Sequence, residues 1–159
     1  MYKHLVVAID GSNTSLKALR HAVEIADKSG SKITLVNIAN PTEYMALAPE
    51  FLQEDSYEAT ALANAENVLN KAEALAKSLG ATEIQRHITV SVKGARDMAQ
   101  QLVDYSAQNG ADLLVLGTNG RTGLMHLLMG SFAETVMRQT TLPLLIIRGT
   151  DVDVANDDE

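Results

Sequence analysis

The 159-residue sequence contains no cysteine, no long apolar run and no excess of basic residues. Without cysteine, the chain has neither disulfides nor thiol chemistry. No apolar stretch approaches the roughly 20 residues of a membrane-spanning helix, so we expect no membrane insertion. Lys and Arg number 13 against 20 Asp and Glu, a net charge of −7. This balance is unlike the basic surface of a nucleic-acid-binding protein, so we expect no nucleic-acid partner.

The two ends of the sequence are also poor in targeting features. Met1 to His4 lead directly into an apolar run, without the charged region, apolar region and cleavage site of a signal peptide. We therefore expect a cytoplasmic protein. Residues 149–159 hold five acidic residues and no Lys or Arg. They predict a flexible acidic tail, with binding of a cation or a basic partner as the alternative.

What the sequence does contain is an alternation of short apolar runs with segments of helical periodicity. Strands are predicted over 5–9, 32–38, 83–92, 113–116 and 143–148. Helices are predicted over 14–29, 57–79 and 131–140, and around an inner face at 99–106. Gly30 is expected to end the first helix, and Leu79 to lie on the inner face of the second. Residues 39–55 lack periodicity and predict a loop that can hold a short helix, a length typical of a functional flap.

This order predicts one α/β domain over residues 1–148, with a parallel sheet covered by helices on both faces. The strands lack polar alternation, as expected of strands that are buried on both sides. Ligands of such sheets bind beyond the carboxyl ends of the strands, where the strand order switches. Asp10 follows the first strand and Gly117 ends the fourth. If these strands are neighbours, both residues face one cleft.

The segment after the fourth strand carries the most specific pattern. Gly117, Gly120 and Gly130, followed by Ser131, connect a buried strand to a helix start. Glycine allows the backbone to approach a ligand closely, and a helix start offers unpaired N–H groups to phosphate. The spacing Gly-x2-Gly-x9-Gly-Ser differs from the dinucleotide-binding and P-loop patterns, and no Gly-Lys-Ser/Thr occurs. The alternative is a plain turn, with Ser131 as a helix cap.

Other candidates for chemistry are sparse. Asp10 lies in a ligand position, and its alternative role is a turn or capping residue. The four histidines are scattered without metal-ligand spacing, although His126 lies inside the glycine segment. Ser12 and Ser131 have no evident base, so nucleophilic catalysis is not supported. No catalytic residue is therefore assigned.

With these motifs, the sequence resembles the ATP-binding branch of the universal stress protein family. The resemblance runs from the segment ending in Asp10-Gly-Ser12, through the run ending at Gly117, to the last strand. It implies a five-stranded parallel sheet in order 3-2-1-4-5 with helices on both faces, as in adenine nucleotide alpha hydrolase-like folds. It also implies a homodimer, with ATP bound between strands one and four.

The resemblance places the nucleotide site at Ala8, Asp10, Ile38, Leu116, Gly117, Asn119, Gly120, Gly130, Ser131, Phe132 and Ala133. By this resemblance Asp10 holds the adenosine and the backbone of Ile38 contacts adenine. Gly130 and Ser131 offer a backbone N–H and a hydroxyl to phosphate. Asn119 reaches a phosphate or its metal. The family often has proline closely after the glycine that follows strand three; here Gly94 has none, and its role is left unassigned.

The resulting hypothesis is an ATP-binding stress-response regulator, acting through nucleotide-dependent contacts with an unknown protein partner. We expect Mg²⁺ to accompany ATP, held mainly by the nucleotide's own oxygens. A slow ATPase or nucleotide-transfer enzyme is one alternative, and a nucleotide-independent interaction module is another. The apolar last strand predicts homodimer pairing at a sheet edge, the alternative being a protected edge in a monomer. Leu127, Leu128 and Met129 are expected either to cover the nucleotide or to contact the partner chain.

Overall fold

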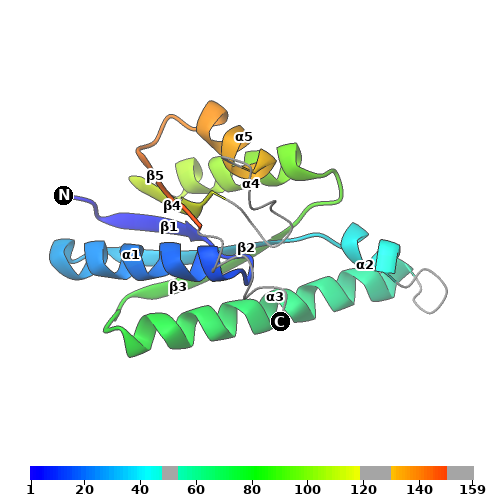
Figure 1. Ribbon diagram of the computed structural model, residues 1–159, viewed down its shortest axis with the longest axis horizontal. Helices are drawn as coiled ribbons and strands as arrows, with labels where there is room; N and C mark the ends of the chain where they lie inside the picture. Colours follow the sequence, from blue (N-terminus) through cyan, green and yellow to red (C-terminus); the bar gives the residue numbers. More distant parts are fainter. Residues whose placement is uncertain (48–53, 119–129, 150–159) are drawn as a thin grey trace.

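A computed structural model describes residues 1–47, 54–118 and 130–149 of the chain (Figure 1). Its centre is one five-stranded sheet in the order β3-β2-β1-β4-β5, in which every neighbouring pair is parallel. The strands are β1 (His4–Ala8), β2 (Lys32–Ala39), β3 (Ile84–Val90), β4 (Leu113–Gly117) and β5 (Leu144–Ile147). The predicted sheet and its order are confirmed.

Helices cover both faces of this sheet, as Figure 1 shows. They are α1 (Asn13–Ser29), α2 (Thr42–Leu47), α3 (Glu54–Ser78), α4 (Ala95–Gln108) and α5 (Ser131–Gln139). One core joins α1 and α3 to one face, and a second joins α4 and α5 to the other. Residues 39–55, predicted to form a loop that can hold a short helix, contain the short helix α2. Among the described residues, no helix combines the length and apolar character needed to cross a bilayer.

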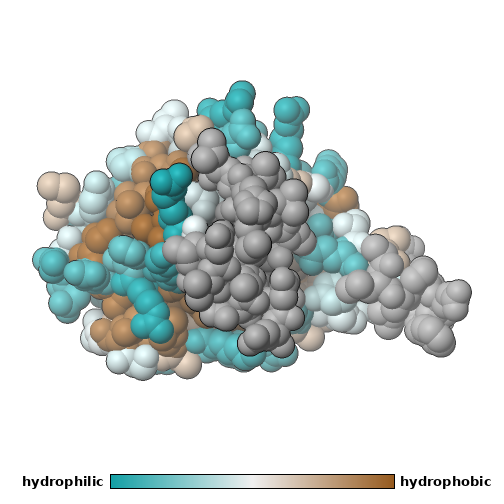
Figure 2. Space-filling model, viewed as in Figure 1, coloured by the Kyte–Doolittle hydropathy of each residue, from teal (hydrophilic) through white to brown (hydrophobic). Residues whose placement is uncertain are grey.

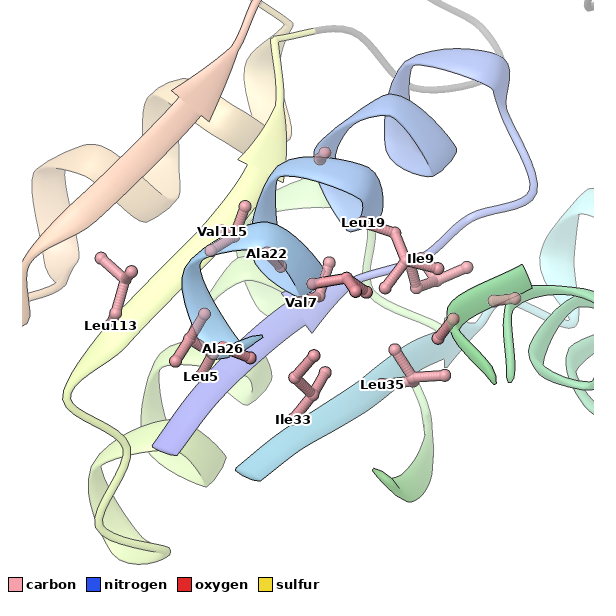
Figure 3. Packing of buried hydrophobic residues seen from close by; sticks show 14 of the residues in the cluster. Leu5, Val7, Ile9, Leu19, Ala22, Ala26, Ile33, Leu35, Leu113 and Val115 are labelled. Carbon is pink, nitrogen blue, oxygen red and sulfur yellow. The ribbon is translucent and has the colours of Figure 1, made fainter. Parts of the chain in front are cut away.

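Side chains of consecutive strand residues enter opposite cores. Leu5 and Val7 face α1 and α3, whereas Val6 packs against α4 and α5. Figure 3 shows the first core, where Leu19 of α1 meets side chains from the neighbouring strands. Each fully buried side chain of this size contributes about 1.5–3 kcal/mol relative to remaining exposed. Burial on both faces explains why the strand sequences are continuously apolar.

The ends of the helices follow local sequence chemistry. The Ser12 side chain caps α1 by accepting a hydrogen bond from the Ser15 N–H at 3.1 Å. Gly30 ends α1 in the left-handed conformation, with φ 65°, as predicted. Leu79 was expected on the inner face of the long helix, and this is wrong: α3 ends at Ser78, and Leu79 turns outward with 41% of its surface exposed.

Candidate functional site

A cavity of about 540 Å³ opens at the carboxyl ends of the central strands. This volume lies within the range of small-molecule sites, about 300–1,000 Å³. Nine of the expected site residues line the cavity: Ala8, Asp10, Ile38, Leu116, Gly117, Gly130, Ser131, Phe132 and Ala133. The remaining two, Asn119 and Gly120, lie outside the described residues, as do His126 and the residues expected to cover the nucleotide.

The position of the cavity follows from the strand order. β1 pairs with β2 on one side and with β4 on the other, so the chain leaves β1 in one direction and later returns to its opposite edge. The strand order therefore reverses direction at β1. The connections that leave the strands on the two sides of this point run apart and leave a crevice at the strand ends. Asp10 and Gly117 both reach this crevice, as expected if β1 and β4 are neighbours.

Asp10 both stabilises a turn and lines the cavity. Its Oδ1 accepts a hydrogen bond from the Ser12 N–H at 2.9 Å, which shapes the turn between β1 and α1. Nearby, the Asn37 side-chain amide donates to the Ile9 carbonyl at 2.8 Å and ties the end of β1 to β2. The carboxylate of Asp10 is thereby held at a defined place beside the cavity.

The start of α5 offers backbone N–H groups to the cavity. Gly130 is the residue that caps the helix, with φ −71° and ψ 159°, and within the described part of the chain no side chain caps the first N–H groups. The first helical hydrogen bond runs from the Glu134 N–H to the Gly130 carbonyl at 3.0 Å. The N–H groups of Ser131, Phe132 and Ala133 therefore precede the helical ladder, at the positive end of its dipole.

Two expectations for this helix start need correction. Ser131 is not the cap, because Gly130 occupies that position and Ser131 is the first helical residue. The Gly130 N–H donates to the Thr118 carbonyl at 2.7 Å, so it is already engaged and is not a free donor for phosphate. This bond ties Gly130, at the start of α5, to Thr118, the residue after β4. The N–H groups that precede the helical ladder and remain available are those of the three residues after Gly130.

Gly117 has a packing reason to be glycine. A Cβ at this position would lie 2.5 Å from Cγ2 of Thr14, in the first turn of α1. Contacts this short essentially never occur between real carbon atoms, so the side chain of Thr14 or the helix itself would have to shift. The close approach of α1 to the end of β4 thus explains Gly117 without any ligand.

Sequence reasoning missed the far wall of the cavity. Asn40 and Tyr44 line it from the segment after β2, Asn64 from α3, and Ala95 and Met98 from the start of α4. The first two lie in a segment without periodicity, and α3 has the sequence pattern of a core helix. Gly94 was the available indication for α4. It precedes that helix with φ 91° and ψ −172°, a conformation essentially restricted to glycine.

The described lining of the cavity is electrostatically simple. It contains the carboxylates of Asp10 and Glu43 and, within 1–47, 54–118 and 130–149, no Lys or Arg. In this described lining, the groups that could attract the negative part of a ligand are therefore the backbone N–H groups of α5 and not cationic side chains. No group of three or more His, Asp or Glu among the described residues could hold a metal ion.

His4 and His87 make contacts that stabilise the fold and do not belong to the candidate site. His4 Nε2 lies 2.7 Å from Thr34 Oγ1 in the buried start of β1. Burial and the nearby Lys32 ammonium lower the pKa of His4 from its ordinary value of 6.5. The His87 ring stacks on Tyr105 at 3.9 Å, and burial lowers the pKa of His87. Neither histidine lines the cavity.

Comparisons with known proteins agree with this fold. A model of the universal stress protein family matches residues 1–148. The universal stress protein MJ0531 of Methanocaldococcus jannaschii is 30% identical, covering 93% of this chain and 83% of the relative. The structure of the hypothetical protein MJ0577 has the same fold, with TM-score 0.79 at 22% identity, covering 95% and 99% of the two chains. A universal stress protein solved in complex with cAMP has TM-score 0.67 at 28% identity, covering 92% and 97%.

Proposed function

This chain belongs to the universal stress protein family, and on that premise we propose that its cavity binds an adenine nucleotide, ATP with Mg²⁺. The observation that carries the proposal is the meeting of two features in one cavity: the strand-end carboxylate of Asp10 and the start of α5, whose cap residue Gly130 has no side chain. Nucleotide occupancy would change the surface that the protein presents to a partner, so that it acts as a cytoplasmic stress-response regulator. Such regulation requires that the nucleotide bind two conformations with different affinity.

The parts of the nucleotide are assigned to different walls. Asp10 accepts hydrogen bonds from the ribose hydroxyls, and the backbone at Ile38 contacts the adenine edge. The N–H groups of Phe132 and Ala133 bind phosphate oxygens at the helix start. Mg²⁺ neutralises part of the phosphate charge and is held mainly by phosphate oxygens and water. The related protein solved with cAMP supports an adenine ligand for this family fold.

Isothermal titration calorimetry of the native protein tests the proposal directly. We expect saturable binding of Mg²⁺-ATP below millimolar concentration. An Asp10→Asn variant is a matched probe, because asparagine retains the Oδ1 acceptor for the Ser12 N–H while losing the carboxylate charge. It should fold normally and bind ATP more weakly. A well-folded native protein that takes up no ATP at millimolar concentration contradicts the proposal.

Binding is expected to outweigh catalysis. Among the described lining residues there is no histidine or lysine to act as a general base or phosphate clamp. Steady-state phosphate release should therefore be far slower than the median enzyme rate of about 10 per second. Turnover near that rate would instead support the ATPase or nucleotide-transfer alternative. If the protein binds no nucleotide, the remaining hypothesis is the nucleotide-independent interaction module.

We also propose that two chains pair through β5. This strand is at the edge of the sheet, and Leu144, Leu145 and Ile146 are only half-buried. Figure 2 shows apolar surface on the side of the molecule where β5 lies in Figure 1. An exposed apolar edge invites pairing with the same strand of another chain.

Light scattering at micromolar concentration should give twice the 17.1 kDa chain mass. Ile146→Lys should shift the population toward the monomer, because it places a charge on the apolar edge strand. Val92→Lys is the control, since Val92 is 60% exposed and lies two residues after β3, the strand at the opposite edge of the sheet. A native monomer, or equal effects of both substitutions, contradicts pairing through β5.

A further inference from the structure

The wall that α4 contributes to the cavity is not held by an ordinary helix cap. Ala95 and Met98, in the first two turns of α4, line the cavity. The residue that precedes the helix is Gly94, which has no side chain with which to cap it. No proline occupies the first helical position to restrict the backbone there. The direction in which α4 leaves the turn must therefore be set by other contacts.

A polar network built on Asp97 makes those contacts. The Ser91 hydroxyl donates to Asp97 Oδ2 at 2.6 Å, and the Gln101 side-chain amide donates to the same oxygen at 2.8 Å. The Gln101 amide also donates to the Val90 carbonyl at 3.0 Å, and its oxygen accepts from the Thr89 hydroxyl. The first two turns of α4 are thereby tied to the last residues of β3 and the residue after it.

The network is anchored in the cavity wall on its other side. Ser91 is 2% exposed, and its N–H donates to the Ala39 carbonyl at 2.9 Å. Ala39 lines the cavity at the end of β2. Asp97 is therefore linked through Ser91 to one cavity wall, and by its place on α4 it lies between Ala95 and Met98 on another. The bonds that Asp97 accepts from Ser91 and Gln101 therefore connect these two walls.

Asp97 is suited to this role as an ionised group. The hydrogen bonds from Ser91 and Gln101 lower the pKa of its carboxyl from the ordinary value of 3.8. Hydrogen bonds to a charged acceptor are shorter and stronger than those between neutral groups. At neutral pH the carboxylate accepts both bonds, and the position of the helix start is defined.

We propose that Asp97 is a positioning residue for the nucleotide site: it sets the spacing of the α4 wall from the end of β2 by bridging Ser91 and Gln101. This inference rests on the proposed nucleotide binding. Asp97 contacts no ligand itself in this assignment; it places Ala95 and Met98 against the nucleotide. In metal sites, replacing the residues that orient the direct ligands lowers affinity by about 10–100-fold, and a nucleotide site needs the same kind of support for its contact residues.

Calorimetry with Mg²⁺-ATP on the native protein, Asp97→Ala and Asp104→Ala tests the assignment. Asp104 is the matched control, because it accepts a bond from Gln100 at 2.7 Å on the exposed side of the same helix. We expect Asp97→Ala to weaken binding about tenfold, the lower end of the range for residues that orient the ligands of metal sites. Asp104→Ala should bind as the native protein does.

A second variant separates positioning from a general structural role. Asp97→Asn retains an acceptor oxygen for Ser91 and Gln101 and should recover most of the affinity lost in Asp97→Ala. Affinity is measured well below the unfolding midpoint of each ligand-free variant, so that lost stability does not appear as lost binding. Unchanged affinity in Asp97→Ala, or equal losses in Asp97→Ala and Asp104→Ala, overturns the inference. If the native protein binds no ATP, it is the proposed function that fails.

Discussion

Replacing Gly130 with valine is expected to lower the affinity for ATP at least about tenfold, or roughly 1.4 kcal/mol. Gly130 lines the cavity directly before the N–H groups of α5 that are assigned to phosphate. A branched side chain there crowds the approach of the phosphates to Phe132 and Ala133. The backbone at Gly130, with φ −71° and ψ 159°, lies in a region open to every residue, so valine causes no backbone strain.

The Gly130 experiment separates the helix N–H groups from the neighbouring hydroxyl. Ser131→Ala removes the hydroxyl and leaves all the backbone donors in place. If the N–H groups dominate binding, the affinity of Ser131→Ala for ATP should fall by less than about threefold. This loss is smaller than the loss of one full hydrogen bond to a charged group. Circular dichroism confirms that each variant is folded before titration. Native affinity in a folded Gly130→Val protein removes the α5 start from the phosphate site.

Gly117→Ala is expected to reduce the free energy of unfolding by about 1–3 kcal/mol, the usual cost of forcing a methyl group into a packed interior. The new Cβ would lie 2.5 Å from Thr14 Cγ2, and 3.4 Å from the carbonyl carbon of the same residue. Because Thr14 is 1% exposed, its side chain has little free space into which to move. Urea unfolding of the ligand-free protein measures the effect without any contribution from nucleotide.

The identity of the clash can be checked with a second substitution. Thr14→Ser removes Cγ2 and retains the hydroxyl, so Gly117→Ala should cost much less in the Thr14→Ser background. A double-mutant cycle gives this coupling free energy, which should be about 0.5–3 kcal/mol for residues in contact. Equal costs in both backgrounds would show that the strain at Gly117 arises elsewhere. The rescued double variant then shows whether Gly117 has an additional role toward the nucleotide.

Much of the candidate site could be predicted because its residues follow strand ends. Asp10 lies two residues after the end of β1 and Gly117 ends β4, so the parallel sheet places both at the same edge. Gly130 and Ser131 introduce α5, and their position at a helix start follows from the sequence pattern. Asp10 lies more than 100 positions before the other three residues, yet the shared edge of the parallel strands brings Asp10 and Gly117 together.

Other lining residues could not be predicted in this way. Asn64 lies midway along α3, where helical spacing distinguishes inner from outer positions but does not show which inner positions border a cavity. Met98 lines the cavity from the first turn of α4, where helical spacing likewise does not show which positions border a cavity. Contacts of this kind depend on the angles and distances at which the elements pack, and no fixed residue spacing in the sequence reveals them.

The sequence by itself determined the alternation of strands and helices, the burial of both sheet faces and the place of Gly30 at the end of α1. These are consequences of local backbone preference and of apolar periodicity, which act over a few residues. The tertiary structure decided that Gly130 caps α5, that the Gly130 N–H is engaged by Thr118, and that Gly117 accommodates Thr14. Each of these depends on an approach between distant segments, and only the packed fold brings such segments within atomic contact.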